Sequence, residues 1–127
     1  MIYIVELSIP ANTSIVDPAH AVLGVNLGVV TQVWVRWRWG SGNLCGVVIK
    51  RAGVQTWPLP GDTWFVSRLE ETTWQENLHV DDYPLFFDLY AYNLDDTFPH
   101  TVSVFMNLQQ SQMSQSAQNF VELLTRS

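Results

Sequence analysis

The residues that most often carry catalysis or bind metals are few and scattered in this 127-residue chain. His20, His79 and His100 lie far apart, and none of them stands in a His-x-x-x-His pair or beside a second cysteine, as zinc sites require. Cys45 lies in an apolar run, where a thiol behaves as a small hydrophobic side chain and no neighbouring base activates it. The sequence therefore predicts neither a metal centre nor a cysteine nucleophile.

Three acidic pairs remain, at Glu70-Glu71, Asp81-Asp82 and Asp95-Asp96. Adjacent residues on a strand point to opposite faces, so such a pair does not make a two-carboxylate catalytic site by itself. Loop oxygens of Asn93, Asp95 and Asp96 suit calcium, but the twelve-residue EF-hand pattern is absent and solvated turn residues are the simpler interpretation. His100 follows Phe98-Pro99, where its ring is expected to satisfy backbone groups of the loop. We expect no enzymatic activity and no cofactor.

The charge and the aromatic content of the chain indicate which kind of molecule it binds. Twelve acidic residues oppose six basic ones, and a net charge of −6 argues against nucleic acid as the main ligand. Six Trp, four Tyr and six Phe in a chain that is only 14% charged favour protein contacts, because aromatic side chains are enriched at interfaces. We expect neither a signal peptide nor a membrane span, and we expect synthesis in the cytoplasm, since no apolar run approaches about 18 residues.

Alternation of apolar and polar residues indicates an all-β fold for residues 1–108. The predicted strands cover residues 1–9, 19–25, 29–39, 44–50, 54–57, 64–66, 73–80, 85–93 and 100–108. About eight short strands with turn residues between them are typical of a β-sandwich or jelly roll. Gly40-Ser41-Gly42-Asn43 tolerates positive φ, so residues 29–39 are expected to return as a hairpin onto residues 44–50.

The long strand at residues 29–39 presents two different faces. Alternation assigns one set to the core: Val29, Thr31, Val33, Val35, Trp37 and Trp39. It assigns the other set to the surface: Val30, Gln32, Trp34, Arg36 and Arg38. We interpret Trp34, Arg36 and Arg38 as partner-binding residues, and Trp34 can also stack with Arg36 as a cation–π pair.

Exposed indole rings support a second interpretation. Sugar-binding β-sandwiches lay pyranose rings on such faces, and Trp34, Trp57, Trp64 and Trp74 are the candidates. Packing in the core or at an interface is the competing role, because Trp is on average highly buried.

The composition changes at Gln109. A Gln- and Ser-rich tether and a short helix are predicted for residues 109–127, after the β-domain of residues 1–108. Within residues 109–127, apolar residues recur at helical spacing: Met113, Ala117, Phe120, Val121 and Leu124. A helix of about 10 residues is too short to be stable alone, so it must pack on its own domain or on a neighbouring subunit. Phe120, Val121 and Leu124 are the residues expected to anchor this C-terminal arm.

Four segments occur in an order that resembles small all-β virion structural proteins of tailed bacteriophages: residues 9–13, 28–35, 55–61 and 92–102. The most specific of them reads Asn-x-Asp-Asp-Thr-Phe-Pro-His-Thr and precedes the last predicted strand. The likeness covers residues 9–108, whereas Trp37, Arg38, Trp39 and the C-terminal extension depart from it.

The resemblance implies a non-enzymatic part of the particle. Within that class we favour a capsid decoration (cement) protein on the outside of the head, bound to the major capsid protein. Many copies on one shell favour a homo-oligomer, with a trimer as first choice and a dimer as second. A tail, receptor-binding or carbohydrate-binding module is the alternative, and head and tail locations both stay open.

Overall fold

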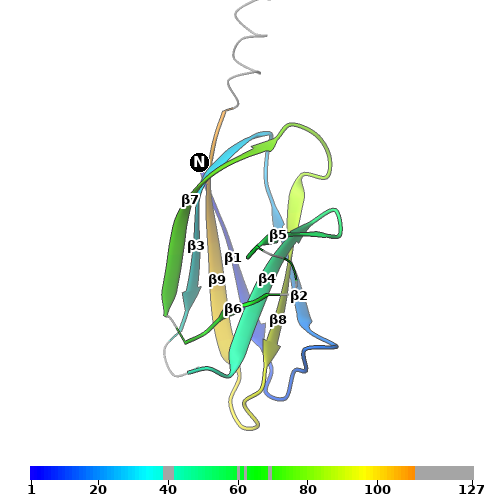
Figure 1. Ribbon diagram of the computed structural model, residues 1–127, viewed down its shortest axis with the longest axis vertical. Coiled ribbons are helices and arrows are strands. Elements are labelled where there is room, and N and C mark those ends of the chain that lie inside the picture. Colours follow the sequence, from blue (N-terminus) through cyan, green and yellow to red (C-terminus); the bar gives the residue numbers. More distant parts are fainter. Residues whose placement is uncertain (39–41, 60, 62, 69, 111–127) are drawn as a thin grey trace, which may run out of the picture.

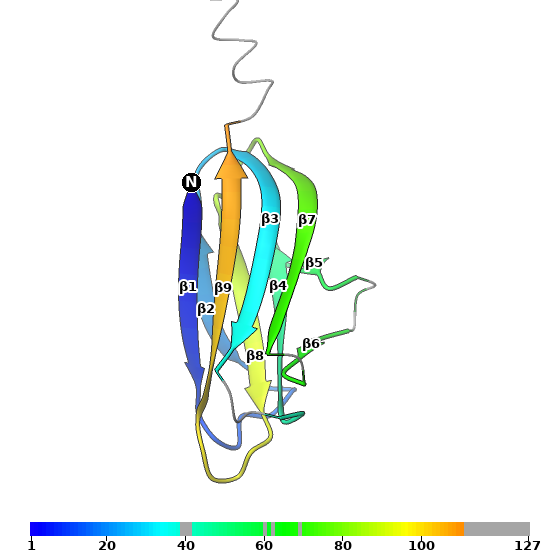
Figure 2. The same ribbon diagram turned by 90° about the vertical axis from the view of Figure 1, so that its left-hand side faces the viewer.

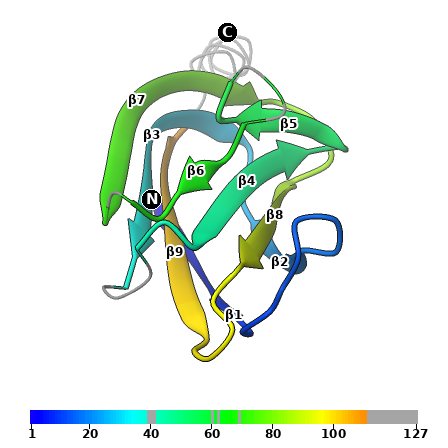
Figure 3. The ribbon, with the colours of Figure 1, turned by 60° about the horizontal axis from the view of Figure 1, so that its bottom comes forward.

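The computed structural model describes residues 1–38, 42–59, 61, 63–68 and 70–110, and they form two antiparallel sheets packed face to face (Figures 1 and 3). The four-stranded sheet has the order β1 (Ile2–Ile9), β9 (His100–Gln109), β3 (Gly28–Trp37) and β7 (Glu71–Val80). The five-stranded sheet has the order β2 (Ala19–Gly24), β8 (Phe86–Asn93), β4 (Cys45–Arg51) and β5 (Val54–Trp57), with β6 (Phe65–Val66) also paired to β4.

The predicted β-sandwich is confirmed, and each predicted strand matches an observed one within a few residues. The C-terminal arm with Phe120, Val121 and Leu124 lies outside the described residues. Among the residues that are described, no helix has the length and apolar character that crossing a membrane would take.

The strands pair in a nested order. β1 pairs with β9, β2 with β8, β3 with β7, and β4 with β5, all antiparallel. The expected hairpin between residues 29–39 and 44–50 is therefore wrong, because β3 and β4 lie in different sheets. Both lateral edges of β3 are occupied by β7 and β9, and β4 pairs with β5, β6 and β8 in the other sheet.

The core lies between the sheets and follows the predicted alternation closely. On β9, Val102, Val104 and Met106 are fully buried, and on β8 the same holds for Phe87 and Leu89. These side chains point toward each other from opposite sheets, so burial of apolar surface holds the two layers together.

A β-bulge changes the alternation at the start of β3. Opposite β9, Val30 pairs with Leu108 and Gln32 with Asn107, which leaves Thr31 as an extra residue. Val30 therefore joins the core cluster and Thr31 does not, so the simple alternation was wrong at these two positions. From Val33 to Trp37 the inward face is the predicted one, and Trp34 and Arg36 lie on the outer face. Arg38 is exposed, as predicted, and Trp39 lies outside the described residues.

Candidate functional site

The outer face of the four-stranded sheet carries a row of apolar side chains. Ile4 lies opposite Phe105, and Phe105 lies opposite Trp34, so the three side chains form neighbours across β1, β9 and β3. Ile2 lies two residues from Ile4 on the same face, and both isoleucines are 57% exposed. We call Ile2, Ile4, Trp34 and Phe105 the apolar patch. A shallow hollow lies between Ile2, Trp34, Phe105 and Arg36.

Charged side chains border the patch on the side toward Ile9. The register places Glu6, Ser103, Arg36 and Glu71 in one row across the sheet. Nη2 of Arg36 lies 3.4 Å from Oε1 of Glu71, and the guanidinium lies 5.6 Å from the ring centroid of Phe105. Arg36 thus covers Phe105, and the expected cation–π pair of Arg36 with Trp34 is replaced by this contact.

Arg38 forms a second exposed ion pair in the next row. Its Nη2 lies 3.3 Å from Oε1 of Glu6, which also accepts a hydrogen bond from Oγ of Ser103 at 3.3 Å. Exposed pairs of this kind contribute little to stability, typically up to about 1 kcal/mol. Their main effect here is to set opposite charges side by side along one border of the apolar patch.

The structure brings together the predicted residues Trp34, Arg36 and Arg38 and adds partners that sequence reasoning missed. Ile2, Ile4 and Phe105 come from strands distant in sequence and join Trp34 only through pairing. The sequence did contain a signal for Phe105: it is an aromatic residue on a face of its strand whose other side chains, such as Ser103, are polar, as expected of an exposed contact residue.

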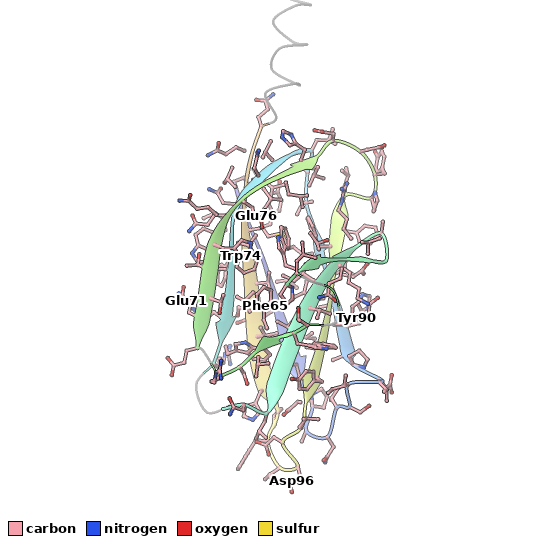
Figure 4. The ribbon with its side chains drawn as sticks, in the orientation of Figure 1. Phe65, Glu71, Trp74, Glu76, Tyr90 and Asp96 are labelled. Atoms are coloured by element: carbon pink, nitrogen blue, oxygen red, sulfur yellow. The ribbon has the colours of Figure 1, made fainter. Side chains whose placement is uncertain are left out.

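Two of the four tryptophans considered as sugar platforms are held inside the molecule. Trp57 is 6% exposed and stacks on Phe87 with ring centroids 5.6 Å apart. Nε1 of Trp57 and Nε1 of Trp74 both donate to Oε1 of Glu76, at 2.6 and 2.9 Å. Phe65 stacks on Trp74, and Figure 4 shows Phe65, Trp74 and Glu76 close together between β7 and β6. Trp57 and Trp74 are therefore packing residues that close one side of the sandwich.

A groove of about 450 Å³ lies on the outer face of the five-stranded sheet. It is lined by Ile15, Pro18, Val48, Lys50, Gln55, Trp64 and Tyr90. Nζ of Lys50 lies 5.3 Å from the ring centroid of Tyr90, and the His20 ring stacks on the same tyrosine at 4.7 Å. Trp64 packs edge-on against Tyr92 with ring centroids 5.0 Å apart and supplies the indole ring of this groove.

The loop after β8 is organised by a buried amide. Asn93 is fully buried, and its Nδ2 donates to the backbone carbonyls of Ile9 at 3.1 Å and Phe98 at 2.9 Å. Its Oδ1 accepts from the backbone N–H of Asp95 at 2.9 Å and from Sγ of Cys45 at 3.3 Å. One side chain therefore joins β1, β4 and both ends of the loop.

Asp95 continues this network. Its Oδ1 accepts the backbone N–H of Thr97 at 2.9 Å, and its Oδ2 lies 2.8 Å from Nε2 of His100. The hydrogen bond from His100, followed by that from Thr97, lowers the pKa of Asp95. His100 thus meets a carboxylate and not the loop backbone groups expected from the sequence. These hydrogen bonds engage side-chain oxygens of Asn93 and Asp95, and no three His, Cys, Asp or Glu side chains gather as a metal site within the described ranges.

The Cys45 thiol lies at the other end of the same network. It is fully buried, and burial raises its pKa to about 11. The group therefore stays protonated at neutral pH and is shielded from solvent.

Comparison of the chain with protein-family models, curated proteins and solved structures finds no match.

Proposed function

We propose that the protein is a bacteriophage capsid decoration (cement) protein that binds the outer surface of the head and stabilises the shell by non-enzymatic contacts. The observation that carries the proposal is the apolar patch with its border of Arg36 and Arg38 on one face of a sandwich. Exposed apolar surface of this kind, rimmed by polar residues, is typical of protein contact sites, where aromatic and Arg side chains are enriched. The major capsid protein is the proposed partner.

The strand pairing supports a jelly-roll interpretation of the sandwich. Nested pairing makes the chain one long antiparallel hairpin, β1 to β4 against β5 to β9, that is rolled into two sheets. Jelly rolls occur in viral capsid and lectin domains, which is compatible with both the proposed function and its alternative. Within this proposal, residues 109–127 form the C-terminal arm, and Phe120, Val121 and Leu124 anchor it on the shell or on a sister subunit.

Decoration also agrees with the physics of repeated binding. A capsid offers the same site many times, so a modest contact at each copy becomes firm attachment when copies are linked to each other or engage by more than one surface. The apolar patch and the C-terminal arm would supply two such contacts per chain, and the net charge of −6 makes contact with viral DNA unfavourable.

Binding to capsids tests the proposal directly. The full chain is mixed with shells assembled from the major capsid protein of the same genome, and pelleted protein is measured after sedimentation. We expect the double variant Trp34→Ala, Phe105→Ala to lose affinity about tenfold or more, because it removes the centre of the patch. Trp64→Ala on the opposite sheet is the matched control and should bind as the unchanged chain does. Equal binding by the patch variant would overturn the proposal.

A tail or receptor-binding module that holds carbohydrate is the second candidate, and the groove with Trp64 favours it. The groove combines an indole ring with the ammonium group of Lys50, which suits a sugar ring bearing a carboxylate. Titration against acidic oligosaccharides checks this candidate. It requires saturable binding that Trp64→Ala abolishes and Trp34→Ala leaves unchanged.

A further inference from the structure

β1 is an edge strand of the four-stranded sheet. Figure 2 shows it at the margin of the sheet, with β9 on one side, and no strand of the described residues pairs with its other side. The amine of Met1 donates to the carbonyl of Leu108 at 2.8 Å, and the N–H of Leu108 donates back to Met1 at 2.9 Å. Because bonding to one neighbour alternates along an antiparallel strand, the odd-numbered residues of β1 bond to β9. The even-numbered residues Ile2, Ile4, Glu6 and Ser8 therefore direct their N–H and C=O groups away from the sheet.

This edge lacks the features that usually prevent strands of different chains from pairing. Natural edges carry prolines, lysines, bulges or inward-pointing charges. β1 pairs eight consecutive residues with β9 without a register shift, and Glu6 is its single charged residue. The opposite edge, β7, is protected, since its register breaks opposite Thr31 and Glu76 points inward to two indoles.

We propose that β1 pairs with β1 of a second copy of this chain, so that two four-stranded sheets become one continuous sheet across a two-fold axis. The N–H and C=O groups that point away from β9 must lie opposite the same groups of the second copy. This is the case when Val5 lies on the two-fold axis, directly opposite Val5 of the second copy. This register places Ile2 opposite Ser8 of the second copy and Ile4 opposite Glu6, and each of these pairs exchanges two hydrogen bonds. The edge is thus self-complementary, as an isologous two-fold contact requires.

Other registers are less favourable. If the pairing of the two β1 strands is shifted by two residues so that Glu6 lies on the axis, Glu6 lies opposite Glu6 of the second copy. Like charges directly opposite each other are destabilising. A shift in the other direction leaves Ser8 without a partner. The register with Val5 on the axis avoids both defects.

Side chains on both faces also favour a second copy as the occupant. On the outer face, Ile4 becomes the diagonal neighbour of Ile4 in the second copy, so the two apolar patches meet across the seam. On the inner face, Tyr3 lies opposite Leu7 of the second copy, and both side chains are already packed against the core. The result is a dimer in place of the trimer favoured from the sequence.

The oligomeric state of the full chain tests the inference. Sedimentation velocity at micromolar concentration should give twice the 14.5 kDa mass of one chain. Ile4→Pro removes an outward-facing N–H and no bond to β9, so we expect the dimer dissociation constant to rise about tenfold or more. Ile4→Thr keeps both the N–H and β-branching and should stay dimeric. A monomeric unchanged chain overturns the inference, and so does equal dimerisation of the two variants.

Cysteine cross-linking tests the register independently of any loss of folding. Val5→Cys places two cysteines on the axis in a non-hydrogen-bonded pair, where Cα atoms lie about 4.5 Å apart, within the disulfide range. Ser8→Cys is the matched control, because its two copies would lie about 20 Å apart. Cys45 is fully buried and should not interfere. Mild oxidation should link the Val5→Cys dimer and leave Ser8→Cys unlinked, and the reverse pattern refutes the register.

This inference and the proposed function are tested by different measurements, so one can be refuted while the other stands. Loss of capsid binding in the patch variant concerns the function, whereas the mass of the free chain concerns the edge. Because Ile4 also belongs to the apolar patch, the comparison of Ile4→Pro with Ile4→Thr separates the two roles. If the free chain is monomeric and Ile4→Pro weakens capsid binding more than Ile4→Thr does, the occupant of the edge is a strand of the shell and the second-copy inference is wrong.

Discussion

Replacing Asn93 by alanine should destabilise the fold strongly, although the residue lies outside any proposed binding surface. Its amide is fully buried and holds together three parts of the chain: the end of β1 through Ile9, the far end of the loop through Phe98, and the start of the loop through Asp95. Alanine would leave two carbonyl groups and one N–H without this partner.

The size of the effect follows from counting these bonds. A neutral hydrogen bond contributes about 1 kcal/mol net, and a buried group left unsatisfied costs about 1–3 kcal/mol. The three bonds from the Asn93 amide to Ile9, Phe98 and Asp95 therefore predict a loss of about 3 kcal/mol. The contact with the Cys45 thiol is weak and is not counted. Such a loss is a large share of the 5–15 kcal/mol, roughly, that stabilises an ordinary domain.

Urea unfolding followed by tryptophan fluorescence measures this loss as a shift of the midpoint at constant slope. Asn26→Ala, at an exposed position between β2 and β3, is the matched control and should change the free energy of unfolding by less than about 0.5 kcal/mol. Asn93→Asp keeps the acceptor but turns an oxygen toward two carbonyls, so it should be at least as harmful as alanine. A loss below about 1 kcal/mol for Asn93→Ala would refute the reasoning.

Three further predictions concern the same region. Gly46→Ala would place a Cβ against the Tyr92 ring with too little space, so the same urea titration should show a loss of about 1–3 kcal/mol; an unchanged midpoint would contradict the close packing. The Cys45 thiol, with its pKa raised to about 11 by burial, should resist a thiol reagent at neutral pH until the chain is unfolded, and rapid labelling of the folded protein would argue against this environment. The pKa of Asp95 is lowered below 3.8 in the fold, so its stabilising contribution is present above that value and is lost as the pH falls through the lowered pKa; thermal melts at acid pH should show that Asp95→Asn removes this loss and Asp96→Asn does not.

The strands were predictable because their signals are local. Alternation and the turn residues between the apolar runs located all nine strands of the described residues. Strand pairing was not predictable in this way, because Ile2 pairs with Asn107 from the far end of the chain and core packing decides such contacts. Turn residues after β3 indicated a reversal of the chain, but they do not distinguish a hairpin from a connection that crosses to the other sheet.

The outer face that we propose as the binding surface was predictable only in part for the same reason. Trp34, Arg36 and Arg38 share one strand and its periodicity, whereas Phe105 and Ile4 join them through pairing of distant segments. The bulge at Thr31 had no signature in the sequence, because one extra residue among valines leaves the composition unchanged. Likewise, nothing local indicated that Trp57 and Trp74 share the carboxylate of Glu76.

Residues 93–100, which carry the most specific part of the sequence resemblance, stabilise the loop before β9. In residues 93–100, the Asn93 amide and the Asp95 carboxylate are bonded within the loop and its neighbouring strands, and His100 is bonded to Asp95. A motif used in this way bears on the fold more than on the partner. The proposed partner contact must then depend on the outer faces, where side chains can change without loss of these bonds. A chain that keeps residues 93–100 and replaces Trp34 and Phe105 is therefore expected to keep the sandwich and to lose the proposed capsid contact.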